Sequence, residues 1–181
     1  MKNEIINGAN YTLKPFISAQ ISDKYIGWLN DHEVNKYLEV RRKTQTKESV
    51  KEYIDSFYDG DEKYLWGIYT KKGKHIGTVN ISIDIYNNTA ELGLMIGDKS
   101  YWGQSASDEA IIMVTNFAFN ALKLNRITGG CYAENIGMIF TFKKLGYRRE
   151  AILKESLLKE DGQYIDSYKW AILAREWRSE C

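Results

Sequence analysis

The residues best suited to chemistry lie at positions 97–108, a run of small and polar residues with the sequence Gly-Asp-Lys-Ser-Tyr-Trp-Gly-Gln-Ser-Ala-Ser-Asp. This run lies directly before an amphipathic segment. Backbone N–H groups at the start of a helix have no intrahelical partners and lie at the positive end of the helix dipole, so such a loop can bind a phosphate without a cationic side chain. From the residues alone, an ordinary connection that binds no ligand is an equal alternative.

The segments on both sides of the loop have the periodicities that a phosphate site requires. Before it, apolar residues alternate with Glu91, Gly93 and Met95, as expected for a strand with one apolar face. After it, apolar residues recur at helical spacing from Ala110 to Leu122, and acidic residues occupy the first turn. The sequence therefore predicts a strand, a loop and a helix in direct succession.

The rest of the chain predicts an α+β fold. We expect a strand at 11–15, short helices at 21–29 and 32–38, a helix from the N-cap Thr46 to Gly60, and a meander of strands at 64–70, 78–85 and 90–96. After the long helix, we expect a strand at 126–132, a helix at 135–145, and strands at 147–157 and 164–173. The long helix makes a crossover, which places the strands that it connects in parallel.

Length and composition limit the classes of protein that fit. The 181 residues suffice for a single domain over 1–181 with a substantial core. A net charge of +1 gives no electrostatic argument for a nucleic-acid partner. No long apolar run follows the N-terminus, so we expect no signal peptide and no membrane association. Cys131 and Cys181 lack metal-binding or redox spacing, and a reduced, cytoplasmic location is the simpler expectation.

Several short motifs occur in a distinctive order along the chain. They are Ala-Glu-Leu-Gly-Leu-Met-Ile-Gly at 90–97, Tyr-Trp-Gly-Gln at 101–104, Glu109-Ala110, Asn135, and Lys-Leu-Gly-Tyr at 144–147. Together with residues 161–177, this order resembles the GNAT N-acetyltransferases, above all the branch that includes the ribosomal-protein N-terminal acetyltransferases. The resemblance implies a mixed, mostly antiparallel sheet with a splayed central strand pair and helices on both faces. It also implies acetyl-CoA as co-substrate and no metal.

In such enzymes, the strand before the loop binds the pantetheine arm of acetyl-CoA and the loop binds the pyrophosphate. The resemblance therefore implies that Met95, Ile96 and Asn135 contact the arm. The residues implied for the phosphates are Trp102, Gly103, Gln104, Ser105, Ala106, Ser107 and Asp108. The family pattern has glycine at the position of Ser105 and glycine or alanine at Ser107. A serine adds a Cβ, which hinders the phosphate if the loop needs a positive φ, but its hydroxyl can donate a hydrogen bond.

Glu91 is the first candidate for a catalytic base. An amine attacks a thioester only when it is neutral, so the site needs a group that removes a proton from the ammonium form, directly or through water. Glu91 lies on the less apolar face of its strand and matches an acidic position often used in this way in the family. The alternative is a solvated or salt-bridged carboxylate.

The resemblance does not identify the acid that protonates the departing thiolate. Many relatives have a tyrosine where this chain has Phe142, and others have a serine where it has Met138, and neither residue here can donate a proton. Water, Tyr132 or Tyr147 could replace these donors, or the thiolate could leave without a positioned acid.

The expected acceptor is a small-molecule amine. The candidate contact residues are Trp28, Tyr37, Arg41 and Tyr86, with Trp66 as a further wall residue. Arg41 belongs to three consecutive cations that suit an anionic acceptor, although such a cluster is usually a solvated charge run. Residues 28–41 resemble members associated with surface-sugar biosynthesis, which favours an amino sugar or a nucleotide-linked amino sugar. A protein N-terminus or a polyamine is an alternative acceptor, and a non-catalytic CoA-binding or regulatory module is an alternative function.

Other reactive side chains are expected to have structural roles. His32 lies at a helix junction and His75 in a turn, and neither has an acidic partner at triad or metal spacing, so we expect both at the surface. Cys131, in an apolar strand, is more often a core residue than a nucleophile. Edge strands and exposed aromatic residues are compatible with a homodimer.

Overall fold

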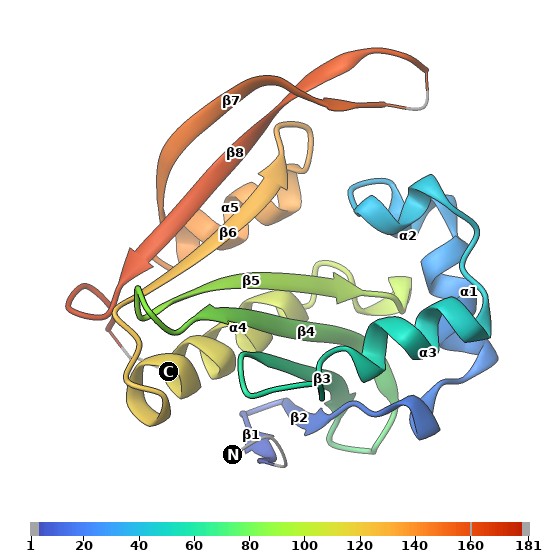
Figure 1. Ribbon diagram of the computed structural model, residues 1–181, viewed down its shortest axis with the longest axis horizontal. Coiled ribbons are helices and arrows are strands. Elements are labelled where there is room, and N and C mark those ends of the chain that lie inside the picture. Colours follow the sequence, from blue (N-terminus) through green and yellow to red (C-terminus); the bar gives the residue numbers. More distant parts are fainter. Residues whose placement is uncertain (1–3, 160, 179–181) are drawn as a thin grey trace.

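The computed structural model describes residues 4–159 and 161–178, which contain one mixed sheet of eight strands (Figure 1). The strands are β1 (Ile6–Asn7), β2 (Tyr11–Pro15), β3 (Lys63–Thr70), β4 (His75–Asp84), β5 (Thr89–Ile96), β6 (Arg126–Tyr132), β7 (Arg148–Leu158) and β8 (Tyr164–Leu173). The α-helices are α1 (Asp23–Asn30), α2 (His32–Asn35), α3 (Lys47–Asp55), α4 (Ala106–Asn116) and α5 (Ile136–Lys144). Short helical turns are η1 (Ser18–Gln20), η2 (Glu39–Arg42), η3 (Lys99–Tyr101) and the π-helical η4 (Phe117–Ala121). Cys181 lies outside the described residues.

The strand pairing confirms the predicted topology. The order in the sheet is β1-β2-β3-β4-β5-β6-β8-β7. Strands β2 to β5 form an antiparallel meander, and β5 pairs with β6 in parallel after the chain crosses over through α4. β6 then pairs with β8, and β8 with β7, both antiparallel. The bounds of β6 and β8 agree with the prediction, and Thr46 caps α3 as predicted.

Several predicted boundaries were wrong, each for a local reason. β4 begins at His75 rather than at residue 78, because Gly73, with a φ of +80°, turns the chain back immediately after β3. α2 ends at Asn35 rather than at residue 38, since Leu38 N donates to Asn35 O at 2.7 Å in a tight turn. α3 ends at Asp55 rather than at residue 60, because tight backbone turns follow it as well.

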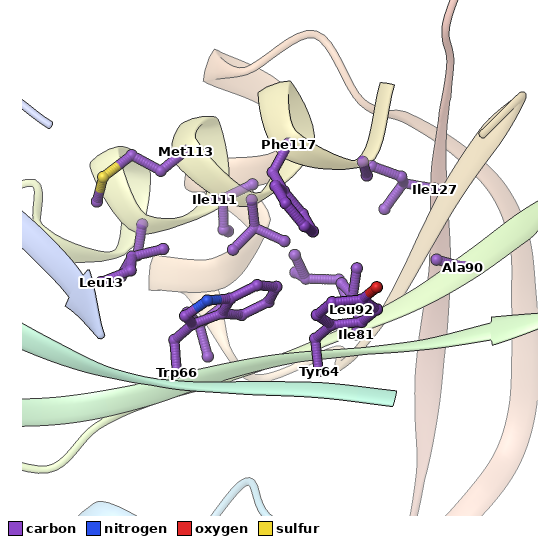
Figure 2. Close-up of a cluster of buried hydrophobic side chains, with 14 of the residues drawn as sticks. Leu13, Tyr64, Trp66, Ile81, Ala90, Leu92, Ile111, Met113, Phe117 and Ile127 are labelled. Atoms are coloured by element: carbon purple, nitrogen blue, oxygen red, sulfur yellow. The ribbon is translucent and has the colours of Figure 1, made fainter. Parts of the chain in front are cut away.

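Alternating side chains from the same strands build two cores, one on each face of the sheet. On one face, Trp66 and its neighbours pack against α4 (Figure 2). On the other face, Leu65 and Met95 pack with residues of α1 and α3, among them Trp28 and Ile54. Leu65 and Trp66 are adjacent in β3 yet belong to different cores. Helices therefore cover both faces, as predicted.

The two central strands, β5 and β6, separate along their length. Their parallel register runs from Thr89 opposite Arg126 to Leu92 opposite Gly129, whereas β5 continues to Ile96. β6 remains paired with β8 beyond that point. The sheet thus opens into a wedge between the C-terminal halves of β5 and β6 (Figure 1). This wedge is the predicted splayed pair.

Candidate active site

A cleft of about 540 Å³ lies in the wedge between β5 and α5. Its walls come from the end of β5, the loop at 97–108, the start of α5, and α2. Eight predicted cofactor contacts line it, namely Met95, Ile96, Trp102, Gly103, Ser105, Ser107, Asp108 and Asn135. The other two do not line it: Ala106, the first residue of α4, is buried in the core, and Gln104 Nε2 donates to Ser100 O at 2.6 Å.

The loop leads into α4 in a conformation that leaves the first helical N–H groups available. Ser105 is the N-cap, with a φ of 56° and a ψ of 16°, and its side chain makes no capping hydrogen bond. The first backbone hydrogen bond of the helix runs from Glu109 N to Ser105 O at 3.0 Å, so the amides of 106–108 precede the helical pattern. Together with the positive end of the α4 dipole, this arrangement is suited to an anion at the cleft wall, and phosphate binding by the loop remains a prediction.

The two serines that depart from the family pattern differ in backbone conformation. Ser105 has a positive φ, whereas Ser107 lies in the first turn of α4. A residue with a Cβ in the left-handed region costs roughly 1 kcal/mol relative to glycine. The hindrance expected from the sequence therefore applies to Ser105 and not to Ser107.

Asp98 anchors the start of the loop to the rest of the protein. Its carboxylate accepts from Ser100 Oγ at 2.6 Å and pairs with Lys24 at 2.9 Å and Lys74 at 3.0 Å. The hydrogen bond from Ser100, with those from both lysines, holds the pKa of Asp98 well below its ordinary value. Trp102 Nε1 donates to the carbonyl of the last β5 residue at 2.8 Å. The loop is therefore attached to α1, to the turn between β3 and β4, and to β5.

Asp108 and Asn135 organise the wall where α4 meets α5. The Asp108 carboxylate accepts from Thr141 Oγ1 at 2.9 Å and from Lys144 Nζ at 2.6 Å, which connects the two helices and balances its charge. Asn135 caps α5, since its Oδ1 accepts from Met138 N at 3.1 Å. The capping role is confirmed, and a contact with a ligand remains a prediction.

Glu91 lies at the closed end of the wedge rather than in the cleft lining. It pairs with Thr128 of β6, one position before the last β5–β6 pair, and it is on the same face of β5 as Met95. Its Oε1 accepts a hydrogen bond from Lys169 Nζ at 2.9 Å. The salt-bridged state considered from the sequence is therefore observed, and the role as base remains a prediction. Sequence analysis missed Lys169, because a contact between β8 and β5 depends on the strand order.

The tyrosines considered as alternative acids lie outside the cleft. Tyr147 is buried, its hydroxyl lies 2.9 Å from Thr115 Oγ1, and burial raises its pKa well above the ordinary value. Tyr132 donates to Glu39 Oε1 at 3.0 Å, and burial together with that carboxylate raises the pKa of Tyr132. Tyr101 does line the cleft. Sequence analysis did not select it, although it lies within the loop that drew attention first.

A second hollow of about 410 Å³ adjoins the cleft and shares Lys36, Tyr37 and Glu134 with it. Its remaining walls are formed by His32, Arg41, Tyr132, Lys159, Asp161 and Ile165. Tyr37 OH donates to Glu134 O at 3.0 Å, which connects the segment after α2 to the end of β6. Two of the predicted acceptor contacts, Tyr37 and Arg41, therefore come together in this hollow.

Arg41 is a structural connector as well as a wall residue. Its side chain is 5% exposed, and its guanidinium donates to Tyr132 OH and, at 2.8 Å, to Leu158 O. It thereby joins η2 to β6 and to the end of β7. Arg42 is exposed and pairs with Glu39 at 2.7 Å. The solvated charge run was therefore a wrong interpretation for Arg41 and is confirmed for Arg42.

The other predicted acceptor contacts line neither the cleft nor the second hollow. Trp28 is buried beneath the start of the loop, where a Cβ on Gly97 would lie 2.2 Å from the Trp28 ring. Trp66 is buried in the core on the α4 face. Tyr86 is fully exposed in the turn between β4 and β5, at the end of β5 away from the cleft.

The structure corrects the interpretation of His75. It is the first residue of β4 rather than a turn residue, and its ring packs against Phe16 and Tyr69 with centroid distances of 4.9 Å to each. Burial lowers the pKa of His75 to about 4. His32 is exposed and Cys131 is buried, both as predicted.

Within residues 4–159 and 161–178, no group of three or more His, Cys, Asp or Glu side chains is arranged to hold a metal ion. In the same part of the chain, no helix combines the length and the apolar character needed to cross a bilayer.

A splayed sheet with a cleft in its wedge and a helix N-terminus on the cleft wall defines an acetyltransferase fold. The acetyltransferase (GNAT) domain model matches residues 11–148, and the chain belongs to this family of N-acetyltransferases. The chain is similar to an uncharacterized N-acetyltransferase, p20 of Bacillus licheniformis, at 28% identity over 160 residues, covering 86% of this chain and 89% of p20. The probable N-acetyltransferase YjcK of Bacillus subtilis is 32% identical over 130 residues, 70% of each chain. Among solved structures, RimL, a ribosomal alpha-N-protein acetyltransferase in complex with Coenzyme A, gives a TM-score of 0.84 at 14% identity, covering 94% of this chain and 98% of RimL.

Proposed function

We propose that this N-acetyltransferase moves an acetyl group from acetyl-CoA to the primary amine of a small acceptor, with an amino sugar or a nucleotide-linked amino sugar favoured. One observation carries the proposal: the part of β5 that has no β6 partner leads, along one cleft, to the available amides at the start of α4. A ligand with an extended amide-containing arm and a pyrophosphate matches both features of this wall.

The residues of the cleft fit acetyl-CoA at both of its ends. The amides of 106–108 bind the pyrophosphate, and the exposed edge of residues 93–96 binds the amide groups of the pantetheine arm as an added strand would. Asn135 and Met138 form the opposite wall. When bound, acetyl-CoA supplies the acetyl group activated as a thioester. The Coenzyme A complex of RimL supports this use of the fold.

Glu91 receives the proton that the acceptor must lose. Because Glu91 lies outside the cleft lining, the proton reaches it through water. The neutral nitrogen then bonds to the acetyl carbon as the carbon–sulfur bond breaks, and the thiolate takes up a proton. Phe142 is buried against Gly129 and has no proton to give, and Tyr132 and Tyr147 lie outside the cleft lining, so water is our candidate donor to the thiolate.

The second hollow is our candidate for the body of the acceptor. It opens from the cleft at Tyr37, and its cations are Lys36, Arg41 and Lys159, of which Lys159 pairs with Glu134 and Asp161 at 3.3 and 3.6 Å. This charge pattern favours an amine that also carries a phosphate or carboxylate over a polyamine. The similarity to RimL supports a protein N-terminus as the alternative acceptor. Met138 and Phe142, in place of proton donors, support a non-catalytic CoA-binding module as the second alternative.

Two measurements test the proposal. Millimolar acetyl-CoA should raise the melting temperature, because a ligand that binds the folded state stabilises it by mass action. Release of free CoA thiol is then followed with glucosamine, phosphorylated glucosamine, a nucleotide-linked amino sugar, spermidine and a short peptide. We expect turnover with the sugars. Turnover restricted to spermidine or to the peptide would contradict the favoured acceptor. Binding of acetyl-CoA without turnover of any amine would contradict the proposed catalytic activity. Absence of binding would contradict the proposal that the cleft holds acetyl-CoA.

A further inference from the structure

Lys169 crosses one strand of the sheet to reach another. It lies in β8 opposite Gly130 of β6, yet its Nζ donates to Glu91 Oε1 of β5 at 2.9 Å. The lysine side chain runs over Gly130, where an added Cβ would lie at contact distance, 3.5 Å from Lys169 Nζ. The lysine therefore passes over a glycine to contact the proposed base.

This contact lies at the vertex of the wedge. Glu91 pairs with Thr128, and the last β5–β6 pair is one residue further on, at Leu92 and Gly129. Thr128 Oγ1 donates to Ala90 O at 3.1 Å at the same level. Two side-chain contacts therefore hold β5 just before it separates from β6: Thr128 joins it to β6, and Lys169 joins it to β8.

The ion pair is too exposed to matter much for stability. The side chains of Lys169 and Glu91 are 46% and 58% exposed, and exposed pairs contribute at most about 1 kcal/mol. The effect of the ion pair is to orient the Glu91 carboxylate, because a glutamate side chain on an open sheet surface otherwise samples several rotamers. An oriented carboxylate is what proton transfer in a defined geometry requires.

We propose that Lys169 is a positioning residue for acetyl transfer, which holds the Glu91 carboxylate at the vertex so that its second oxygen, Oε2, receives the proton from the acceptor. This inference rests on the proposed function and on Glu91 as base. Lys169 itself neither gives nor takes a proton during the transfer. Oε1 stays with Lys169 throughout, and the proton that reaches Oε2 passes on to solvent.

The first test is Lys169→Met, assayed with acetyl-CoA and the amine that turns over fastest in the acceptor panel. We expect kcat to fall about tenfold, because the Glu91 carboxylate remains present as base but is no longer held in one orientation for proton transfer. The KM for acetyl-CoA should stay within about twofold. Lys169→Arg keeps the charge and the donor and should restore most of kcat. A lower KM for the amine in Lys169→Met would mean that the lysine competes with the acceptor, and would overturn the proposal.

Lys154→Met is the matched control. Lys154 lies in the neighbouring strand β7, is 77% exposed and pairs with Asp166 at 2.8 Å, so it is, like Lys169, an ion-paired surface lysine, but its partner is not Glu91. We expect its kcat to equal that of the wild type. An equal loss in both variants would assign the effect to general surface charge and would overturn the positioning role.

A double-mutant cycle with Glu91→Gln shows whether Lys169 acts through Glu91. In the Glu91→Gln background, Lys169→Met should cause no further loss, because coupled residues are not additive. The same tenfold loss in both backgrounds would overturn the inference. The proposed function fails separately, if the wild type shows no turnover. If Glu91→Gln is slow but Lys169→Met has the wild-type rate, Glu91 remains the base and the role of Lys169 is excluded. If Glu91→Gln has the wild-type rate, both roles are excluded.

Discussion

The two ends of the candidate active site are built by different kinds of interaction. At the loop of residues 97–108, the wall includes backbone amides in a defined conformation, and short-range contacts such as Asp98 with Ser100 and Trp102 with the end of β5 stabilise it. At the second hollow, side chains from distant segments meet: Tyr37 contacts Glu134, and Arg41 contacts the end of β7. A backbone site suits a ligand shared by a whole family, whereas a side-chain site can change with each acceptor.

This difference makes the two ends separable by mutation. Substitutions at the loop should alter acetyl-CoA binding, and those at the second hollow should alter acceptor binding. Glu91 lies between them, at the vertex, and should affect the chemical step without strong effects on either ligand. The following predictions are ordered from the largest expected effect to the smallest.

Glu91→Gln should lower kcat by about a hundredfold, because it removes the proton acceptor while keeping the size of the side chain. The KM for acetyl-CoA should be nearly unchanged, since Glu91 does not line the cleft. Steady-state release of CoA thiol measures both constants. Glu155→Gln, at an exposed position in β7, is the control. A wild-type kcat in Glu91→Gln would exclude it as the base.

His75 should make the core beneath the loop sensitive to acid. Its folded pKa of about 4 lies below the ordinary value of 6.5, so the unfolded chain binds more protons between these values and stability falls as the pH drops through this window. The loss should reach about 3 kcal/mol at most. Urea unfolding between pH 7 and pH 4.5 measures how the free energy of unfolding depends on pH, in a range where titration of carboxylates contributes less to that dependence. His75→Phe should flatten it, and His32→Phe, at an exposed site, should not.

Arg41→Met should raise the KM for the acceptor about tenfold, because the hollow loses a buried cation and its charge-assisted hydrogen bonds. The affinity for acetyl-CoA should stay within about twofold. Calorimetry with acetyl-CoA and steady-state kinetics measure the two effects. Arg42→Met is the control, since Arg42 is exposed and pairs with Glu39. Equal losses for both ligands would show that the two ends are not separable.

Ser105→Gly should stabilise the protein by about 1 kcal/mol, because glycine adopts a φ of 56° without strain. It should also tighten acetyl-CoA binding a few-fold, because it removes the Cβ that hinders close approach of the phosphate. Ser107→Gly is a control with the opposite sign, since glycine inside a helix costs up to about 1 kcal/mol. Thermal unfolding with and without acetyl-CoA measures both effects. A weaker affinity in Ser105→Gly would show that the serine hydroxyl, rather than the backbone, binds the phosphate.

Most of the fold could be predicted because its signals are local. The alternation in β5, β6 and β8, the capping of α3 by Thr46 and of α5 by Asn135, and the crossover through α4 all follow from periodicity and cap chemistry. The errors lie where tight turns decide the boundary, as at His75 and Asn35. Helix and strand ends depend on single hydrogen bonds, and the propensity of a segment does not determine these.

The loop at 97–108 could be placed from sequence between a strand and a helix, since the period changes from two to helical across a run of small residues. Side-chain contacts across the sheet could not. Trp28 was expected near the acceptor and supports the loop from below, Tyr86 lies at the other end of β5, and Lys169 was missed. From the sequence alone, an aromatic or charged residue looks the same whether the fold places it in a core, on the surface or in a binding site.

The sequence by itself determined the strand–loop–helix unit, the sheet with its crossover and the family, because each depends on periodicity and on the order of short motifs. The tertiary structure decided that Ser105 and not Ser107 occupies the strained position, that Arg41 is buried while Arg42 is solvated, and that Lys169 reaches Glu91 over Gly130. These contacts join residues up to 117 positions apart. They depend on which strands become neighbours and on how far two of them separate, and the pattern within any single segment does not contain that information.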